Sequence, residues 1–413
     1  MSSATPPFSA VHLLRNTSFI KLLGFRALIV LSYQMVAVVV GWHIYQITRD
    51  PLALGLVGLA EVIPYFGCAL FAGYAVDHYS RRLFGVLAAI ILFLNTLVLA
   101  VVSSGWITDN PTYWIYGAIA CNGFARAFIA PSYNALFALI LPRNQYTRAA
   151  GLSSSVFQAG LVLGPVVGGI LVGWASITAA YVVAALLSLG SAAAMLMLRV
   201  KEPPPVARTP VFASIAQGLR FVYHNQIMLS AQVLDMFAVL FGGAIALLPA
   251  FIHEIYHYGP EGLGILRAAP ATGAVITGII IARNPINRHA GRILLGAVAG
   301  FGLCSIAFAL TKHFWVAAFI LMVSGIFDGI SVVLRATIMQ LMTPDDMRGR
   351  VASINGIFIG SSNELGAFEQ GVAARLLGLV PAVVFGGLMT LSVVGVTTRF
   401  APKLRKLNLN DLH

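Results

Sequence analysis

Residues 54–103 read LGLVGLAEVIPYFGCALFAGYAV, then DHYSRR, then LFGVLAAIILFLNTLVLAVVS. The first and third pieces are almost wholly apolar. At about 1.5 Å per residue, each is long enough to cross the roughly 30 Å hydrocarbon core of a bilayer as an α-helix. The polar piece between them, 77–82, carries two arginines. This stretch therefore predicts a transmembrane hairpin with a short basic loop at one membrane face.

The same alternation continues along the whole chain of 413 residues, of which 59% are hydrophobic and 10% charged. So apolar a composition is typical of a membrane protein. Apolar runs of bilayer-spanning length lie at about 20–46, 54–76, 83–103, 113–138, 150–173, 178–198, 228–252, 262–283, 291–311, 314–340, 350–376 and 380–398. The sequence therefore predicts an all-α membrane protein with twelve transmembrane helices.

The basic residues indicate how these helices are oriented. Of the 26 Lys and Arg residues, nineteen lie in the N-terminal segment, the even-numbered connections or the C-terminal tail, or at span ends beside them. Only Arg49 and Lys312 lie in odd-numbered connections, and five arginines fall inside spans. Because cytoplasmic loops are enriched in positive charge, we expect both termini of this multi-pass protein in the cytoplasm.

Other bulk properties exclude several classes of protein. The net charge of +12 is accounted for by the cytoplasmic loops, so we expect contact with membrane lipid and no nucleic-acid partner. The three cysteines lie inside spans without metal-ligand spacing, and we expect no metal site. The sequence contains no P-loop, HExxH or GxSxG motif, and its connections are too short for a catalytic domain. We therefore expect no enzyme and no cofactor.

The longest internal connection divides the chain. It begins near residue 199 with RVKEPPP, which cannot continue a transmembrane helix because it is charged and its prolines lack backbone donors. Its later part, 211–223, predicts a short surface helix. We expect an N-terminal six-helix bundle at 1–198, a cytoplasmic linker at 199–227, and a pseudo-symmetric six-helix bundle with a cytoplasmic tail at 228–413.

Charged residues inside the spans are confined to certain helices. Spans three, five, six, nine and twelve contain none away from their ends. A charge in hydrocarbon costs at least ~2.5–3.5 kcal/mol on insertion scales, so the helices that carry charges should surround a central aqueous path. The candidates for substrate binding or proton coupling are Gln34, Glu61, Arg126, Asp235, Asp328, Arg335, Glu364 and Glu369.

The depth of each charge can be counted from the span ends at about 1.5 Å per residue. The count places Arg126, Asp328 and Glu364 near the membrane midplane, with other acids and bases on either side, so ion pairs are feasible. Asp328 is predicted to be a proton or substrate site in a cavity-lining helix; the alternative is a structural ion pair, for which Arg126 is the candidate partner. Asp235 is either a coupling residue or a simple partner of Arg335.

The sequence predicts less specific roles for four of the charged residues inside the spans. Glu364 and Glu369 are about 140° apart around a helix, so they need not share a site. Arg26 and Arg375 lie near span ends, where long side chains reach the membrane surface.

The basic loop quoted above carries a recognisable pattern. Residues 73–82 read GYAVDHYSRR, which resembles the signature GxxxDRxGRR of the major facilitator superfamily, with departures at His78 and Ser80. The resemblance implies a cytoplasmic gate latch against the start of span eleven. The alternative is a loop that only determines topology. The gating candidates here are Gly73, Asp77, Arg81 and Arg82.

Span five carries a second pattern of the same superfamily. Residues 160–169, GLVLGPVVGG, match gxxxGPxxGG, a motif associated with antiporters. Small residues four apart allow close helix approach, and proline can kink the helix, so Gly160, Gly164 and Pro165 are further gating candidates. The alternative is helix packing alone. Four further stretches look like the third drug:proton antiporter family: 44–55 (IYQITRDPLALG), 242–249 (GGAIALLP), 264–270 (GILRAAP) and 348–351 (RGRV). The resemblance runs over nearly the whole chain, and the family includes enterobactin exporters, macrolide efflux pumps and lysophospholipid transporters.

These observations predict secondary active transport by alternating access. The expected activity is proton-coupled efflux of an amphipathic small molecule, a siderophore or a drug-like compound, by a monomer. One alternative is an importer or lysophospholipid flippase of the same fold. The other is a non-transport membrane sensor or scaffold, against which the costly interior charges argue.

Overall fold

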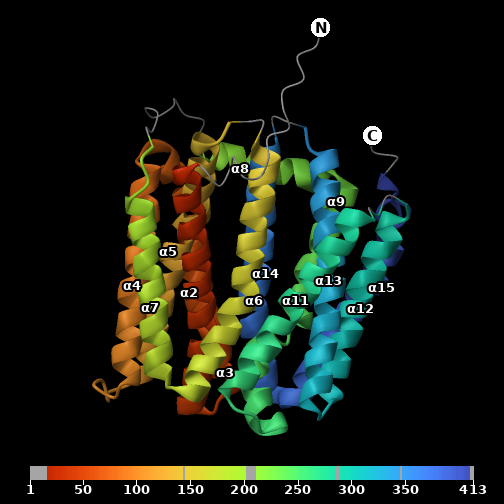
Figure 1. The fold of residues 1–413 in the computed structure, drawn as a ribbon. Coiled ribbons are helices and arrows are strands. Elements are labelled where there is room, and N and C mark those ends of the chain that lie inside the picture. The colour runs from red at the N-terminus through yellow and green to blue at the C-terminus, as the bar shows by residue number, and fades with distance from the viewer. Residues whose placement is uncertain are drawn as a thin grey trace.

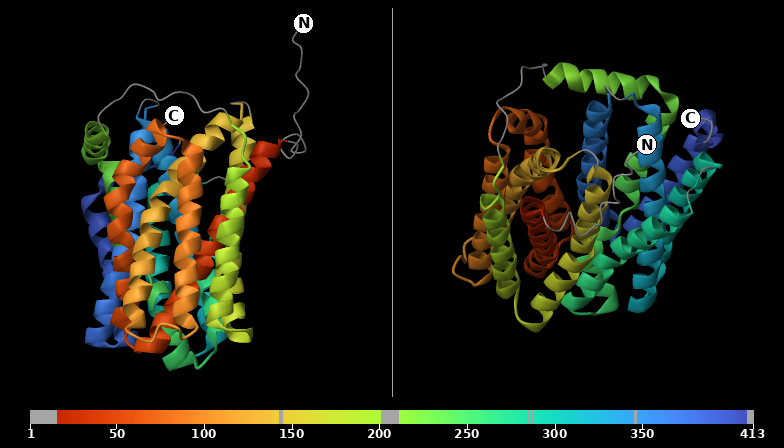
Figure 2. Two further views of the ribbon diagram at one scale, coloured as in Figure 1. Left: turned by 90° about the vertical axis from the view of Figure 1, so that its left-hand side faces the viewer. Right: turned by 45° about the horizontal axis from the view of Figure 1, so that its top comes forward.

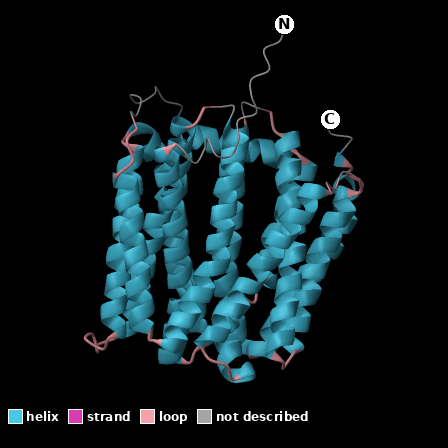
Figure 3. Ribbon diagram, viewed as in Figure 1, coloured by secondary structure: helices cyan, strands magenta, loops and turns pink. Residues whose placement is uncertain are grey.

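The structure of the chain is a computed structural model, which describes residues 16–142, 145–200, 211–284, 286, 288–344 and 347–409. Every regular element in these residues is a helix, and the helices run roughly side by side (Figure 3). The all-α prediction is therefore confirmed.

The first six long helices follow the predicted spans closely. They are α2 (Thr17–Thr48), α3 (Pro51–His78), α4 (Arg81–Ser103), α5 (Pro111–Ile140), α6 (Tyr146–Trp174) and α7 (Ile177–Leu196). Capping residues mark where several of them begin. Asn16 accepts hydrogen bonds from two backbone amides at the start of α2, and Asp50 caps α3 just before Pro51. Ser80 caps α4 in the same way.

Six further spans make up the rest of the chain, and α8 (Val211–His224) precedes them as the predicted short surface helix. Two views show α8 lying along the end of the bundle where α2 begins and α15 ends, which we call the terminal end (Figures 1 and 2). The spans are α9 (Gln226–Gly242) with η2 (Ile245–Leu247), α10 (Leu248–Phe251) and η3 (Ile252–Tyr256), then α11 (Pro260–Arg283), α12 (Ala290–Leu310), α13 (Phe314–Met342), α14 (Arg348–Leu377) and α15 (Leu379–Phe400), followed by the short α16 (Pro402–Arg405).

The span at 228–252 is interrupted, which the sequence reasoning did not anticipate. It crosses as a unit from Gln226 to Tyr256, but α9 stops at Gly242 and the chain resumes with the short turns of η2. The carbonyl freed at Gly242 accepts a hydrogen bond from the Ser305 hydroxyl at 2.6 Å. The break therefore keeps one of its buried polar groups satisfied.

Eleven of the described spans are apolar enough by composition alone to cross a membrane. The twelfth, α14, is 30 residues long and has the right length. It is more polar because it carries Asn355, Asn363, Glu364, Glu369 and Gln370. Three of these residues, Asn363, Glu364 and Gln370, line a cavity between the helices. Its polarity is thus explained by its position inside the bundle.

Helices from the first and second halves of the chain meet tightly on the side of the bundle opposite the terminal end. We call this side the closed end. A Cβ added at Gly371 of α14 would lie 2.8 Å from the Gly55 Cα of α3, and one at Gly264 of α11 would lie 2.6 Å from the Pro165 carbonyl oxygen of α6. Only glycine permits such approaches. Arg375 adds an ion pair to Asp50 at 3.1 Å. These contacts shut the bundle on this side.

A candidate substrate cavity

A cavity of about 700 Å³ lies between the helices that meet at the closed end. Its walls come from α2, α3, α5, α6, the interrupted seventh span, α11 and α14. None of the residues that line the cavity comes from α4, α7, α12 or α15, four of the five spans without interior charges. The fifth, α6, does line the cavity with Phe157, Leu161 and Pro165. The polar residues that line the cavity are Tyr33, Gln34, Glu61, Tyr65, Asn122, Arg126, Arg267, Asn363, Glu364 and Gln370.

An ionic cluster occupies this cavity. Arg126 of α5 donates a hydrogen bond to Glu61 of α3, and its Nη1 lies 4.0 Å from Glu364 Oε1 of α14. The guanidinium also lies over the Tyr33 ring of α2, 5.1 Å from its centre. The side chains of Arg126, Glu61 and Glu364 are 33%, 16% and 26% exposed, so water and solutes can reach them. One arginine therefore contacts carboxylates from two different parts of the chain.

Arg267 makes a second polar contact across the cavity. Its Nη1 donates a hydrogen bond to the Ala37 carbonyl of α2 at 3.0 Å, which links α11 to α2. With Glu61, Glu364 and Arg126, it gives the cavity two acids and two bases. The cluster is neutral when both carboxyl groups are ionised and gains one positive charge when either is protonated.

Gly123 positions Arg126 beside Glu61, and the sequence reasoning overlooked it. A Cβ at Gly123 would lie 2.1 Å from the Glu61 carbonyl oxygen, so α5 and α3 touch through backbone atoms one turn from Arg126. The sequence signal for Gly123 is its position three residues before an arginine inside a span. This signal is not specific, because many other glycines in the chain occupy less crowded places.

We expect Gly123→Ala to lower the yield of folded protein and to cut transport at least tenfold, because the new methyl group must push α5 away from Glu61. Gly117→Ala is the matched control on the same helix, since nothing lies within 4 Å of its added Cβ. It should be neutral or stabilising by up to about 1 kcal/mol. Melting temperature and size-exclusion profile in detergent would show the difference, and equal stability of the two variants would contradict the packing argument.

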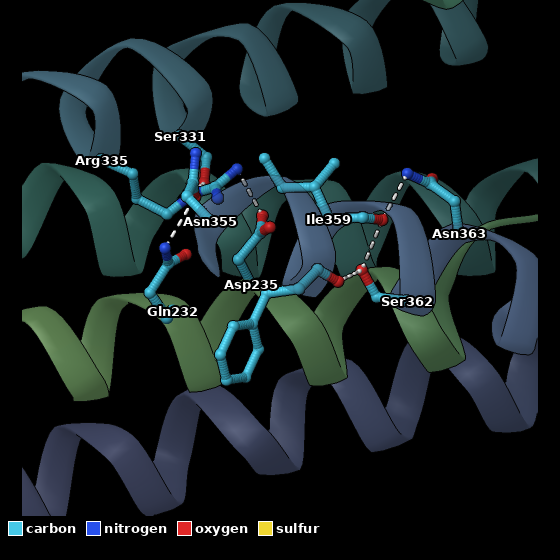
Figure 4. Close-up of polar contacts among 9 residues, drawn as sticks. Gln232, Asp235, Ser331, Arg335, Asn355, Ile359, Ser362 and Asn363 are labelled. Atoms are coloured by element: carbon cyan, nitrogen blue, oxygen red, sulfur yellow. Dashed lines mark hydrogen bonds and ion pairs between the residues drawn. The ribbon is translucent and has the colours of Figure 1, made fainter. Parts of the chain in front are cut away.

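A second polar network lies outside the cavity (Figure 4). Arg335 Nη2 of α13 contacts Asp235 Oδ1 of α9 at 2.7 Å, and the two residues are 4% and 5% exposed. Ser331 accepts a hydrogen bond from Arg335 Nε at 3.3 Å. Nearby, Gln232 Nε2 donates to Asn355 Oδ1 of α14 at 2.6 Å. The Asp235–Arg335 pairing was one of the two predicted alternatives, and the structure forms it.

Two other candidates lie away from the main cavity. Asp328 borders a separate small void of about 10 Å³ with Asp235 and Ser331, and it is not among the residues that line the main cavity. The structure therefore does not bring Asp328 to Arg126, whose ion pairs in the described residues are with Glu61 and Glu364. Glu369 is half-buried and likewise lies outside the lining.

The glycines of the span-five motif pack α6 against α2. A Cβ at Gly160 would lie 2.5 Å from Val30 Cγ1, and one at Gly164 would lie 2.6 Å from Gln34 Cβ. Pro165 lines the cavity and its carbonyl approaches Gly264. These residues thus connect the cavity wall to the closed end, which is compatible with both of the roles considered for them.

The signature loop is only partly visible. Gly73 and Asp77 lie in the last turns of α3, but their side-chain surroundings fall outside the described part of the structure. Arg81 begins α4 and is half-buried, and Arg82 Nη1 donates to the Leu198 carbonyl at 2.9 Å. The predicted latch therefore stays a prediction.

In the part of the chain that the structure describes, twelve spans pack together and most of them surround a polar cavity, an arrangement typical of multi-pass membrane transport proteins. Residues 22–367 match the model of the major facilitator superfamily, and the chain belongs to this family. It is a secondary transporter and not an enzyme, and its family membership implies a small-molecule substrate. The predicted resemblance is confirmed.

Two curated relatives are similar over most of their length. The chain is 24% identical to the multidrug efflux pump Tap of Mycolicibacterium fortuitum, covering 89% of this chain and 91% of the pump. It is also 24% identical to the enterobactin exporter EntS of Salmonella typhi, covering 96% of this chain and 94% of the exporter. Among solved structures, a bacterial homologue of the human lysosomal transporter Spinster, inward-facing and unoccupied, matches with a TM-score of 0.72 and 16% identity over 97% of each chain.

Proposed function

We propose that the protein is a proton-coupled exporter of an amphipathic small molecule, a siderophore or a drug-like compound. The observation that carries this proposal is the Glu61–Arg126–Glu364 cluster inside the cavity. Exchangeable protons need carboxyl groups that water can reach, and both are partly exposed. A substrate in the same cavity competes with a proton for these groups.

The cluster also supplies a way to link protonation to movement. We propose that the bundles at 1–198 and 228–413 move as two bodies joined by the linker at 199–227. Glu61 and Arg126 belong to the first and Glu364 to the second. A proton on Glu364 removes its attraction for Arg126, so the two bundles can separate around the cavity. Loss of that proton restores the attraction.

The named relatives support export, and the cavity lining supports an amphipathic substrate. The positive-inside bias puts the terminal end in the cytoplasm, so the cavity is shut toward the outside and a cytoplasmic molecule enters from the terminal end. The walls combine aromatic and aliphatic side chains with a few polar groups, which suits an amphipathic ligand. Relatives named for multidrug efflux and enterobactin export point the same way. A bacterial inner membrane is the proposed location.

Flux in proteoliposomes tests the proposal. Enterobactin and ethidium serve as probes, and a trapped pH dye reports protons under an imposed gradient. We expect probe movement and proton movement in opposite directions, each dependent on the other. Probe flux without proton movement would contradict the coupling, and flux of lysophospholipid alone would favour a flippase. A chain that moves none of these compounds would contradict the proposed substrate class.

A further inference from the structure

Arg26 is a membrane-embedded cation whose described neighbours include no carboxylate. It lies within α2, and its Cζ is 4.4 Å from the centre of the Tyr133 ring and 4.9 Å from that of Phe157. Its buried Nε has no hydrogen-bond partner among the described residues. The expectation that it reaches the membrane surface is thus not what the structure shows, because two aromatic rings hold it inside the bundle.

The other interior arginines have polar acceptors. Arg126 contacts Glu61, Arg335 contacts Asp235, and Arg267 donates to a backbone carbonyl. A guanidinium has five donors, and the face of an aromatic ring stabilises its charge without accepting them. The Tyr133 hydroxyl is a partner for part of the Arg26 guanidinium, but the Nε donor keeps none among the described residues. A guanidinium N–H donor that has no acceptor inside a membrane protein is a candidate site for binding an anion.

Arg26 lies behind the cavity wall on the side of the terminal end, against the lining residue Phe157. It is seven residues from Tyr33, so the two share a face of α2, and Arg26 lies about 10 Å nearer the terminal end. Tyr33 and Phe157 both line the cavity, so one ring that covers Arg26 is also part of the cavity wall. A molecule that enters from the terminal end passes this arginine before it reaches Glu61 and Glu364.

We infer that Arg26, held by Tyr133 and Phe157, receives an anionic group of the transported molecule, a carboxylate, sulfonate or phosphate. This inference rests on the proposed function and narrows its substrate class to amphipaths with an anionic end. Arg26 lies roughly 10 Å along α2 from Tyr33, whose ring Arg126 covers, so different groups of the protein hold the anion and the exchanged proton.

Two dyes of nearly the same shape test the inference: rhodamine 110, which carries a free carboxylate, and rhodamine 123, its methyl ester. Fluorescence polarisation with purified protein in phosphatidylcholine nanodiscs gives both affinities. We expect the wild-type chain to bind rhodamine 110 about tenfold more tightly, as a charge-assisted hydrogen bond would produce. Arg26→Met should abolish this preference, and Arg26→Lys should keep part of it.

Arg292→Met is the matched control. It removes one exposed arginine at the start of α12, far from the cavity lining, and should leave the preference unchanged. A wild-type chain without preference, including one that binds neither dye, contradicts the inference, and so does a preference that survives Arg26→Met. Because binding is measured without transport, absent flux with an intact preference would overturn the proposed function and leave the anion site standing.

The same anionic chemistry is present on lipid headgroups. Repeating the titration in nanodiscs that contain phosphatidylglycerol separates the two sources. If Arg26 binds a soluble substrate, the Arg26-dependent preference for rhodamine 110 should persist in these anionic nanodiscs. A preference that disappears only in the anionic lipid would assign the site to a lipid headgroup and overturn its assignment to the transported molecule.

Discussion

Replacing Glu364 with Gln should reduce proton-driven accumulation of substrate at least tenfold while leaving substrate exchange in place. The amide is the same size as the carboxyl group and still lines the cavity, so binding is retained. It cannot take up or release a proton near pH 7, and it removes the negative charge that faces Arg126 at 4.0 Å. Transport driven by a pH gradient and exchange of labelled substrate at uniform pH would separate the two activities.

Asp109→Asn is the control for this substitution, because it neutralises an exposed acid in the connection before α5. It should leave both activities at the wild-type level. If Glu364→Gln still accumulated substrate against a pH gradient, Glu364 would not be the coupling group. Asp328→Asn would then be the next variant to examine, although Asp328 lies outside the cavity.

Arg335→Met should produce the largest loss of stability among the interior charges. Asp235 and Arg335 are 5% and 4% exposed, so removing the arginine leaves a buried carboxylate without its partner. Breaking such a pair costs about 3–5 kcal/mol. Unfolding by dodecyl sulfate in mixed micelles would measure the change.

The double variant Asp235→Asn with Arg335→Met should recover much of that loss, because neither position then carries a charge. Arg292→Met again serves as the exposed control and should change stability by less than about 0.5 kcal/mol. A single Arg335→Met variant as stable as the wild-type chain would show that the pair contributes nothing to folding.

The sequence was sufficient for the fold because spans and their orientation depend on composition averaged over about 20 residues. Each predicted span agrees with its helix to within four residues, and even the polar α14 was found because its length and position in the alternation were right. The glycine break after α9 was missed, since an apolar run reads the same whether its helix is continuous or interrupted.

The arrangement of the charges was harder to predict because it depends on helix rotation. Successive residues of a helix are about 100° apart around its axis. An error of that size in the assumed rotation of the helix moves a side chain from the cavity to a neighbouring helix. Asp328 and Glu364 were placed at one depth, yet only Glu364 lines the main cavity. Arg26 was expected to reach the membrane surface because its position along the span carries no information about the rings of Tyr133 and Phe157 that cover it.

The central claim is that substrate and proton exclude each other at the Glu61–Arg126–Glu364 cluster. The most direct test of this claim uses a probe that the protein has been shown to transport. The probe is added to the detergent-solubilised protein in weakly buffered solution, and the protons released on binding are measured. The account predicts release of up to one proton per molecule bound, greatest at acidic pH where the carboxyl group is protonated beforehand, and no release from the Glu364→Gln variant. Saturating binding without any proton release by the wild-type chain at any pH would contradict it.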